Sequence, residues 1–114
     1  MNLATTKLTY HDYLLLPDDG KRYEILDGDL FVTPSPVTRH QLVVGRFLHH
    51  LMTYLETNPI GTVFTAPYDV VLSETDILEP DLILVLTNGR ARITEKNVQG
   101  PPDIVMEVLS PGTA

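Results

Sequence analysis

The sequence lacks the features that mark secreted and membrane proteins. Its 114 residues include no cysteine, which excludes disulfides and thiolate metal sites and gives no sign of an oxidising compartment. No apolar run approaches the roughly 20 residues that a membrane-spanning helix needs. The N-terminal residues also lack the apolar core of a signal peptide. These absences predict a cytoplasmic protein with no membrane attachment.

Positive charge is scarce as well. Eight lysine and arginine residues stand against 15 acidic ones, and the formal net charge is −7. Because phosphate neutralisation supplies much of the affinity of proteins for nucleic acids, this balance on its own argues against a nucleic-acid partner. It does not exclude a metal-dependent nuclease, whose acidic site borrows positive charge from the ion.

Two segments carry helical signals. Apolar residues recur at helical spacing over residues 38–57 and form one broad stripe, so we expect a long helix there. A shorter helix is expected over residues 8–16, where Thr9 and Asp12 have the spacing of a capping box. His40 falls in the first turn of the long helix, whose N-terminus can face the open edge of a site.

The remaining apolar runs predict strands. Asp27-Gly28 indicates a β-hairpin, because a two-residue type I′ turn needs positive φ at both positions. On spacing alone, Glu24 in the first hairpin strand is interpreted as a surface residue. We expect further elements at residues 62–72 (a strand that is interrupted at Pro67 or lies at an edge), 79–86 (a strand), 93–98 (a short helical turn) and 102–111 (a strand). Together they predict one α+β domain over residues 1–114, with a mixed, mostly antiparallel sheet packed on the long helix.

The stretch 102–111 carries an acid in an unusual place. Its almost unbroken apolar run is bounded by prolines, which predicts a buried strand. Alternation puts Glu107 on the same face as Val105 and Leu109. An unpaired carboxylate there would cost several kcal/mol, so we expect a cation, a hydrogen-bond network or a metal to compensate it.

A second acid, Asp81, enters the other continuous apolar strand. Neighbouring strands lie about 4.8 Å apart, so Asp81 and Glu107 can converge on one oxygen-rich site of the kind that Mg²⁺ prefers. Two ordinary interpretations remain open: Asp81 can cap a turn after proline, and Glu107 can form a structural ion pair. The arginines considered for that pair are Arg22, Arg39 and Arg46.

These segments resemble the Uma-type family of restriction endonucleases, within the PD-(D/E)xK nuclease superfamily. The matching pieces are residues 23–30, 34–36, His40, 80–82 and 102–111. The resemblance implies a restriction-endonuclease-like fold, dependence on Mg²⁺ or Mn²⁺, and hydrolysis of DNA phosphodiester bonds through a metal-activated water. It gives Asp81 and Glu107 the places of metal ligands, and it gives Glu24 and His40 accessory acidic and polar places in the catalytic site.

The sequence departs from the superfamily pattern at one position. The pattern has a lysine two residues after the second acid, and this chain has Leu109. Family members supply the lysine from a helix after the Ser-Pro motif, and the chain ends before such a helix. Lys21 and Lys96 are the remaining candidates, and neither has the right context. The alternative function is therefore a non-catalytic remnant or a fragment that acts as a dimerisation or binding module.

The same departure has a consequence for packing. The family fold would place a further helix and strand after residues 110–111, so we expect the C-terminal part of the family fold to be absent. One sheet face and one edge would then be uncovered, which predicts self-association into a homodimer or larger homo-oligomer.

Overall fold

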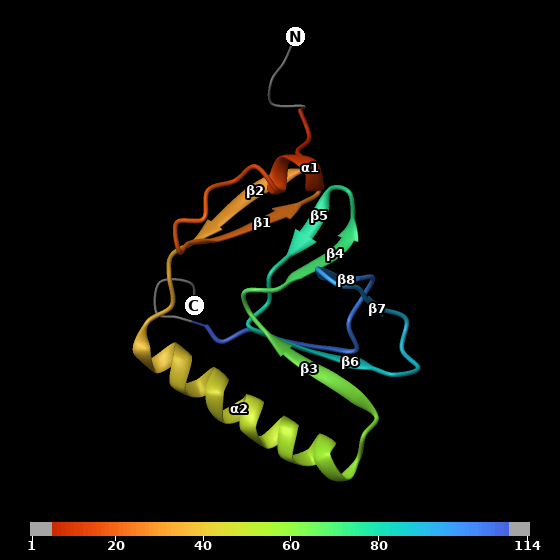
Figure 1. Cartoon of the computed structure of the whole chain (residues 1–114). Helices are drawn as coiled ribbons and strands as arrows, with labels where there is room; N and C mark the ends of the chain where they lie inside the picture. The colour runs from red at the N-terminus through yellow and green to blue at the C-terminus, as the bar shows by residue number, and fades with distance from the viewer. Residues whose placement is uncertain (1–5, 110–114) are drawn as a thin grey trace.

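Two β-sheets and two helices make up the part of the chain that the computed structural model describes, residues 6–109 (Figure 1). The fold is therefore α+β, with strands that are mostly antiparallel, as the sequence predicts. The elements are α1 (Tyr10–Tyr13), β1 (Arg22–Leu26), β2 (Asp29–Thr33), α2 (Thr38–Thr57), β3 (Gly61–Thr65), β4 (Asp69–Ser73), β5 (Asp76–Leu78), β6 (Leu82–Leu86), β7 (Arg92–Ile93), β8 (Asn97–Gln99) and β9 (Ile104–Met106). Neither described helix is long and apolar enough to cross a membrane.

The larger sheet has six strands in the order β2-β1-β5-β4-β8-β7. Its neighbours are antiparallel except for the parallel pair β4 and β8. The hairpin of β1 and β2 confirms the Asp-Gly prediction, because Asp27 and Gly28 have φ of 48° and 78° and connect Leu26 directly to Asp29. Ile25 and Ile77 face each other across β1 and β5 and are fully buried.

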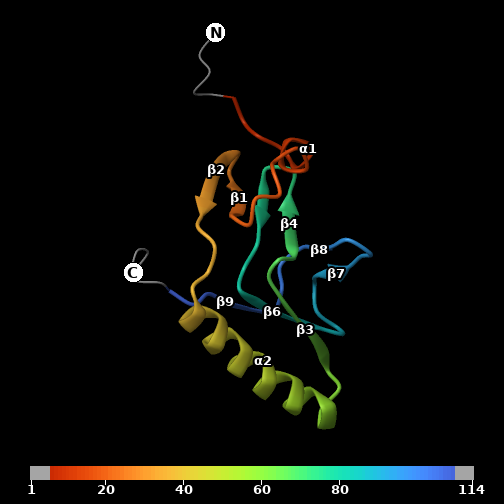
Figure 2. The same cartoon turned by 60° about the vertical axis from the view of Figure 1, so that its left-hand side comes forward.

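The smaller sheet has three antiparallel strands in the order β3-β6-β9. Its central strand, β6, is buried from Leu82 to Val85, which explains its continuous apolar run. Helix α2 has the bounds predicted from its apolar stripe, and it lies along β3 in both views (Figures 1 and 2). Val44 is the buried anchor of this helix among the described residues.

Three sequence predictions about these elements are corrected. The break at Pro67 is present as predicted, but residues 62–72 form two strands in different sheets and not one, because the chain leaves β3 at Ala66-Pro67 and joins the larger sheet at Asp69. Residues 93–98 form strands and not a helical turn, since Val98 is buried in the parallel pairing of β8 with β4. The helix expected over residues 8–16 is only Tyr10–Tyr13, although the Thr9 N–H does donate to Asp12 Oδ2 at 2.9 Å.

The prediction of a buried strand over residues 102–111 is also wrong. Strand β9 covers only Ile104–Met106, pairs with β6 alone, and exposes about half of Ile104 and Val105. An apolar run does not distinguish an edge strand from a central one. At the start of β9, Asp103 Oδ2 accepts the Leu86 N–H at 2.7 Å. Residues 110 and 111 lie outside the described residues.

Candidate functional site

The candidate site lies where the chain passes between the two sheets. The segment Glu79-Pro80-Asp81 connects β5 of the larger sheet to β6 of the smaller one. The segment from Ala66 to Tyr68 makes a second connection, from β3 to β4, and the Ala66 N–H donates to the Asp81 carbonyl at 3.1 Å. Side chains from both sheets and from the start of α2 therefore meet at one place.

Asp81 is the centre of this meeting point, with a side chain that is only 1% exposed. Its Oδ1 accepts a hydrogen bond of 2.6 Å from Arg22 Nη2 and lies 3.0 Å from His40 Nε2. Its Oδ2 accepts the Val108 N–H at 2.6 Å. Both carboxylate oxygens are thus in contact with donors from other parts of the chain.

These contacts keep Asp81 ionised. Burial alone would raise its pKa, but the Val108 N–H and the Arg22 guanidinium, with His40 nearby, hold the pKa below its ordinary value. Arg22 begins β1 and His40 lies in the first turn of α2, so the site ties the hairpin and the long helix to the end of β6. The buried charge is therefore well satisfied.

Glu107 lies directly beyond the last residue of β9. Because Leu82 pairs with Met106, the same register places Glu107 opposite Asp81. The two apolar strands that these acids accompany are therefore neighbours, as predicted. The prediction that Glu107 lies inside its strand is wrong, because β9 ends at Met106 and the Glu107 side chain is 48% exposed. Arg22 Nη1 lies 3.7 Å from Glu107 Oε2, so an arginine compensates this acid, as one of the ordinary interpretations held.

The electrostatic environment of Glu107 is unfavourable to its charge. Partial burial and the negative charges of Asp81 and Glu24 raise its pKa from 4.5 to about 7, against the opposing effects of Arg22 and His40. Burial and the neighbouring acids therefore both disfavour the charged form of Glu107.

Glu24 also belongs to this site and is not the surface residue that its spacing suggests. It shares a strand face with Arg22 on β1, and it is half-buried. Its Oε2 accepts the Glu79 N–H at 2.7 Å, which connects β1 to the segment between the sheets. His40, the fourth predicted site residue, is 10% exposed, and its Nδ1 is buried without a hydrogen-bond partner among residues 6–109.

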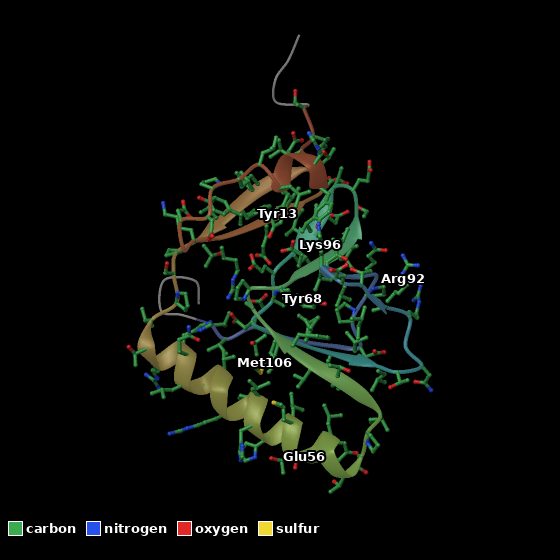
Figure 3. The ribbon with its side chains drawn as sticks, viewed as in Figure 1. Tyr13, Glu56, Tyr68, Arg92, Lys96 and Met106 are labelled. Atoms are coloured by element: carbon green, nitrogen blue, oxygen red, sulfur yellow. The ribbon has the colours of Figure 1, made fainter. Side chains whose placement is uncertain are left out.

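Three further polar residues were missed by the sequence prediction. Tyr13, labelled in Figure 3, is the last residue of α1; its hydroxyl donates to Asp69 Oδ1 at 2.7 Å and lies 3.4 Å from Glu79 Oε2. Asp69 begins β4, and Glu79 directly follows β5. Burial raises the pKa values of Asp69, Glu79 and Tyr13. No motif connects positions so far apart in the chain, and the break at Pro67 was the only local signal.

A pocket of about 480 Å³ joins the two groups of polar residues. Tyr13, Asp69 and Glu79 line it together with Arg22, His40 and Asp81. Its lining also includes the cation Lys21 and apolar side chains from the segment after α1 and from α2: Leu14, Leu16, Pro17 and Val44. The pocket thus reaches Asp81, although the Asp81 side chain itself is only 1% exposed.

The fit of a divalent cation can be tested on these contacts. In the described part of the chain, no group of three or more histidine, aspartate or glutamate side chains could hold a metal alone. Mg²⁺ needs only one or two carboxylates, with water and phosphate oxygens completing its shell. Asp81 and Glu107 provide two hard oxygen ligands in opposed positions. The residues fit such an ion once Arg22 leaves the space between them.

The two lysines considered as substitutes have different positions. Lys21 lines the pocket beside Arg22. Lys96 lies in the turn between β7 and β8, away from α2 (Figure 3). Leu109, at the position of the superfamily lysine, is 68% exposed.

Comparison with known families gives a match over nearly the whole chain. The model of the Uma2 family, whose description is "Putative restriction endonuclease", matches residues 10–114. No curated protein matches the chain. The match covers most of the sequence, including Arg22, His40, Asp81 and Glu107, so the chain belongs to the Uma2 family and, with it, to the PD-(D/E)xK nuclease superfamily.

Proposed function

We propose that the chain is a divalent-metal-dependent endonuclease that hydrolyses phosphodiester bonds of DNA, with Asp81 and Glu107 as its metal ligands. The observation that supports this proposal is the meeting of these two carboxylates at one end of the β6–β9 pair, in a member of a family described as restriction endonucleases. When bound, Mg²⁺ or Mn²⁺ would supply Lewis acidity, which lowers the pKa of water and neutralises charge on a phosphate.

The residues around the ligands have separate roles in this proposal. The Val108 N–H and His40 hold Asp81 in one orientation and favour its ionised form. Glu24 adds a third negative charge near the pair, which favours a cation over a neutral ligand. Because the chain carries a net charge of −7, we expect DNA binding to require the divalent ion as well.

Nicking of supercoiled plasmid in Mg²⁺ or Mn²⁺ tests the proposal. The Asp81→Asn variant should lose activity by at least about 100-fold, because it removes a charged group from the centre of the site. Asp103→Asn is the matched control: Asp103 also accepts a backbone N–H across β6 and β9, but at the other end of the pair. Equal nicking by wild type and Asp81→Asn would refute the assignment.

A second candidate function is that of a binding module without catalysis. It is favoured by Leu109 at the lysine position and by the engagement of both Asp81 oxygens with protein donors. This module would bind the metal ion or DNA without nicking plasmid under any metal condition. Nicking that chelation by EDTA abolishes would refute it.

We also propose that the chain self-associates through its apolar surface. On α2, Leu42, Phe47 and Met52 are each more than half exposed, and Phe31 on the edge strand β2 is 50% exposed. Exposed apolar side chains along a helix and an edge strand favour association with a second copy. Light scattering at high protein concentration should report a dimer or larger species, and a monodisperse monomer would contradict this proposal.

A further inference from the structure

The guanidinium of Arg22 lies between the two proposed metal ligands. Its Nη2 is 2.6 Å from Asp81 Oδ1, and its Nη1 is 3.7 Å from Glu107 Oε2. The Arg22 side chain is 16% exposed and Asp81 is 1% exposed, so solvent screens the first contact weakly. Arg22 thus occupies the position from which a cation would approach both carboxylates.

Arg22 and a divalent cation cannot easily share this position. Asp81 Oδ1 already contacts Arg22 and His40, and Oδ2 accepts the Val108 N–H. An ion bound to Asp81 and Glu107 would lie against the guanidinium, and two positive charges at that separation in a partly buried site repel strongly. One of the two must leave.

We propose that Arg22 and the divalent cation are alternative occupants of the Asp81–Glu107 pair, so that metal binding displaces the Arg22 guanidinium. This inference rests on the proposed metal site and adds to it a residue that competes with the ion. Before metal binding, Arg22 supplies the charge that keeps the two carboxylates in place.

The surroundings of Arg22 allow the exchange. The contact with Glu107 is long, and the pocket of about 480 Å³ opens beside the side chain. Asp69 and Glu79 line that pocket, so a displaced guanidinium would remain among carboxylates. Val108 and His40 contact Asp81 independently of Arg22, and they would keep it oriented during the exchange. The displaced Arg22 guanidinium would also keep a positive charge beside the site, in a chain that has Leu109 at the position of the superfamily lysine.

Calorimetric titration with Mn²⁺ tests the exchange in four proteins: wild type, Arg22→Gln, Lys21→Gln and Glu107→Gln. If Arg22 holds the pair at least about 90% of the time, its removal should tighten Mn²⁺ binding at least about tenfold, because the competent fraction of protein increases by that factor. Lys21→Gln is the matched control, since it removes an adjacent positive charge that lines the same pocket but does not contact Asp81 in the described residues. It should change the affinity much less.

A second measurement uses the wild-type protein, so the test does not depend on the folding of a variant. The Arg22 guanidinium NMR signals should show restricted rotation without metal, and addition of Mg²⁺ should change their chemical shifts and their rotation rate as the guanidinium leaves Asp81. Equal effects of Arg22→Gln and Lys21→Gln, or Arg22 signals that Mg²⁺ leaves unchanged, would overturn the exchange. If the exchange is overturned but Glu107→Gln binds Mn²⁺ more weakly than wild type, the proposed metal site is still supported. Absence of Mn²⁺ binding in both wild type and Arg22→Gln would overturn the exchange and the proposed metal site together.

Discussion

Substitution of Arg22 by methionine should destabilise the metal-free protein severely. Methionine keeps much of the apolar length of the side chain but removes its charge and its hydrogen bond of 2.6 Å to Asp81. The carboxylate of Asp81, 1% exposed, would then keep only the Val108 N–H and the contact with His40. The Asp81 carboxylate would thus remain buried and charged without the positive charge of Arg22 beside it.

The magnitude follows from this geometry. Removal of one partner from a buried ion pair typically costs about 3–5 kcal/mol. The lower end applies here, because two other contacts to Asp81 remain. A loss of about 3 kcal/mol is a large part of the roughly 5–15 kcal/mol that stabilises a typical domain. At about 4–8 °C per kcal/mol for a domain near this size, the Tm should fall by at least about 10 °C.

Urea unfolding followed by circular dichroism, in EDTA at pH 7, measures this cost. The midpoint should decrease with little change in the slope m. Arg92→Met is the matched control, because Arg92 Nη2 donates to Gln99 Oε1 at 2.7 Å on an exposed part of the larger sheet. The control should lose less than about 1 kcal/mol. If both variants lose the same free energy of unfolding, the Arg22–Asp81 pair stabilises the protein no more than an exposed hydrogen bond does.

Two further predictions concern Glu107 and the hairpin turn. The folded-state pKa of Glu107, about 7, exceeds its ordinary value of 4.5, so its contribution to stability is present at low pH and is lost as pH rises through 7. In urea unfolding at pH 8, the free energy of unfolding of Glu107→Gln should therefore exceed that of wild type by about 1 kcal/mol, after allowance for solvent screening of a half-exposed side chain. Near pH 4 the two proteins should be equally stable. The same difference in free energy at both pH values would contradict this prediction. Gly28→Ala should lower the free energy of unfolding by about 1–2 kcal/mol, because Gly28 has φ of 78° and an added Cβ would collide with Lys7. The control is Gly45→Ala on α2, where an added Cβ meets nothing within 4 Å and should stabilise the protein by up to about 1 kcal/mol. An unchanged Tm for Gly28→Ala would show that the turn does not require glycine at position 28.

Elements with local signals could be predicted from the sequence, and elements defined by distant contacts could not. The helix Thr38–Thr57 and the Asp27-Gly28 hairpin were predicted because a helical apolar stripe and a turn dipeptide are properties of neighbouring residues. The division into two sheets and the edge position of β9 depend on pairing between separated strands.

The site divides in the same way. The adjacency of Asp81 and Glu107 could be inferred, because each acid accompanies an apolar strand and such strands tend to pair. The choice of Arg22 among three arginines could not, since its position depends on how the hairpin packs against the end of β6. Tyr13 reaches Asp69 and Glu79 across 56 and 66 positions of sequence, a distance that no pattern in a single chain spans.

Two carboxylates hold the short edge strand β9 against β6, one at each end of the pair. Asp81, beside β6, accepts the Val108 N–H at one end, and Asp103, beside β9, accepts the Leu86 N–H at the other end. A slip of β9 by one residue would break both bonds and turn its side chains to the opposite face. Any ligand or proton that breaks the hydrogen bond between Asp81 and the Val108 N–H therefore also weakens the attachment of β9 at that end. Amide hydrogen exchange at Val108 would then report on the state of Asp81, although the exchanging amide lies in the segment after β9, far from Asp81 in the sequence.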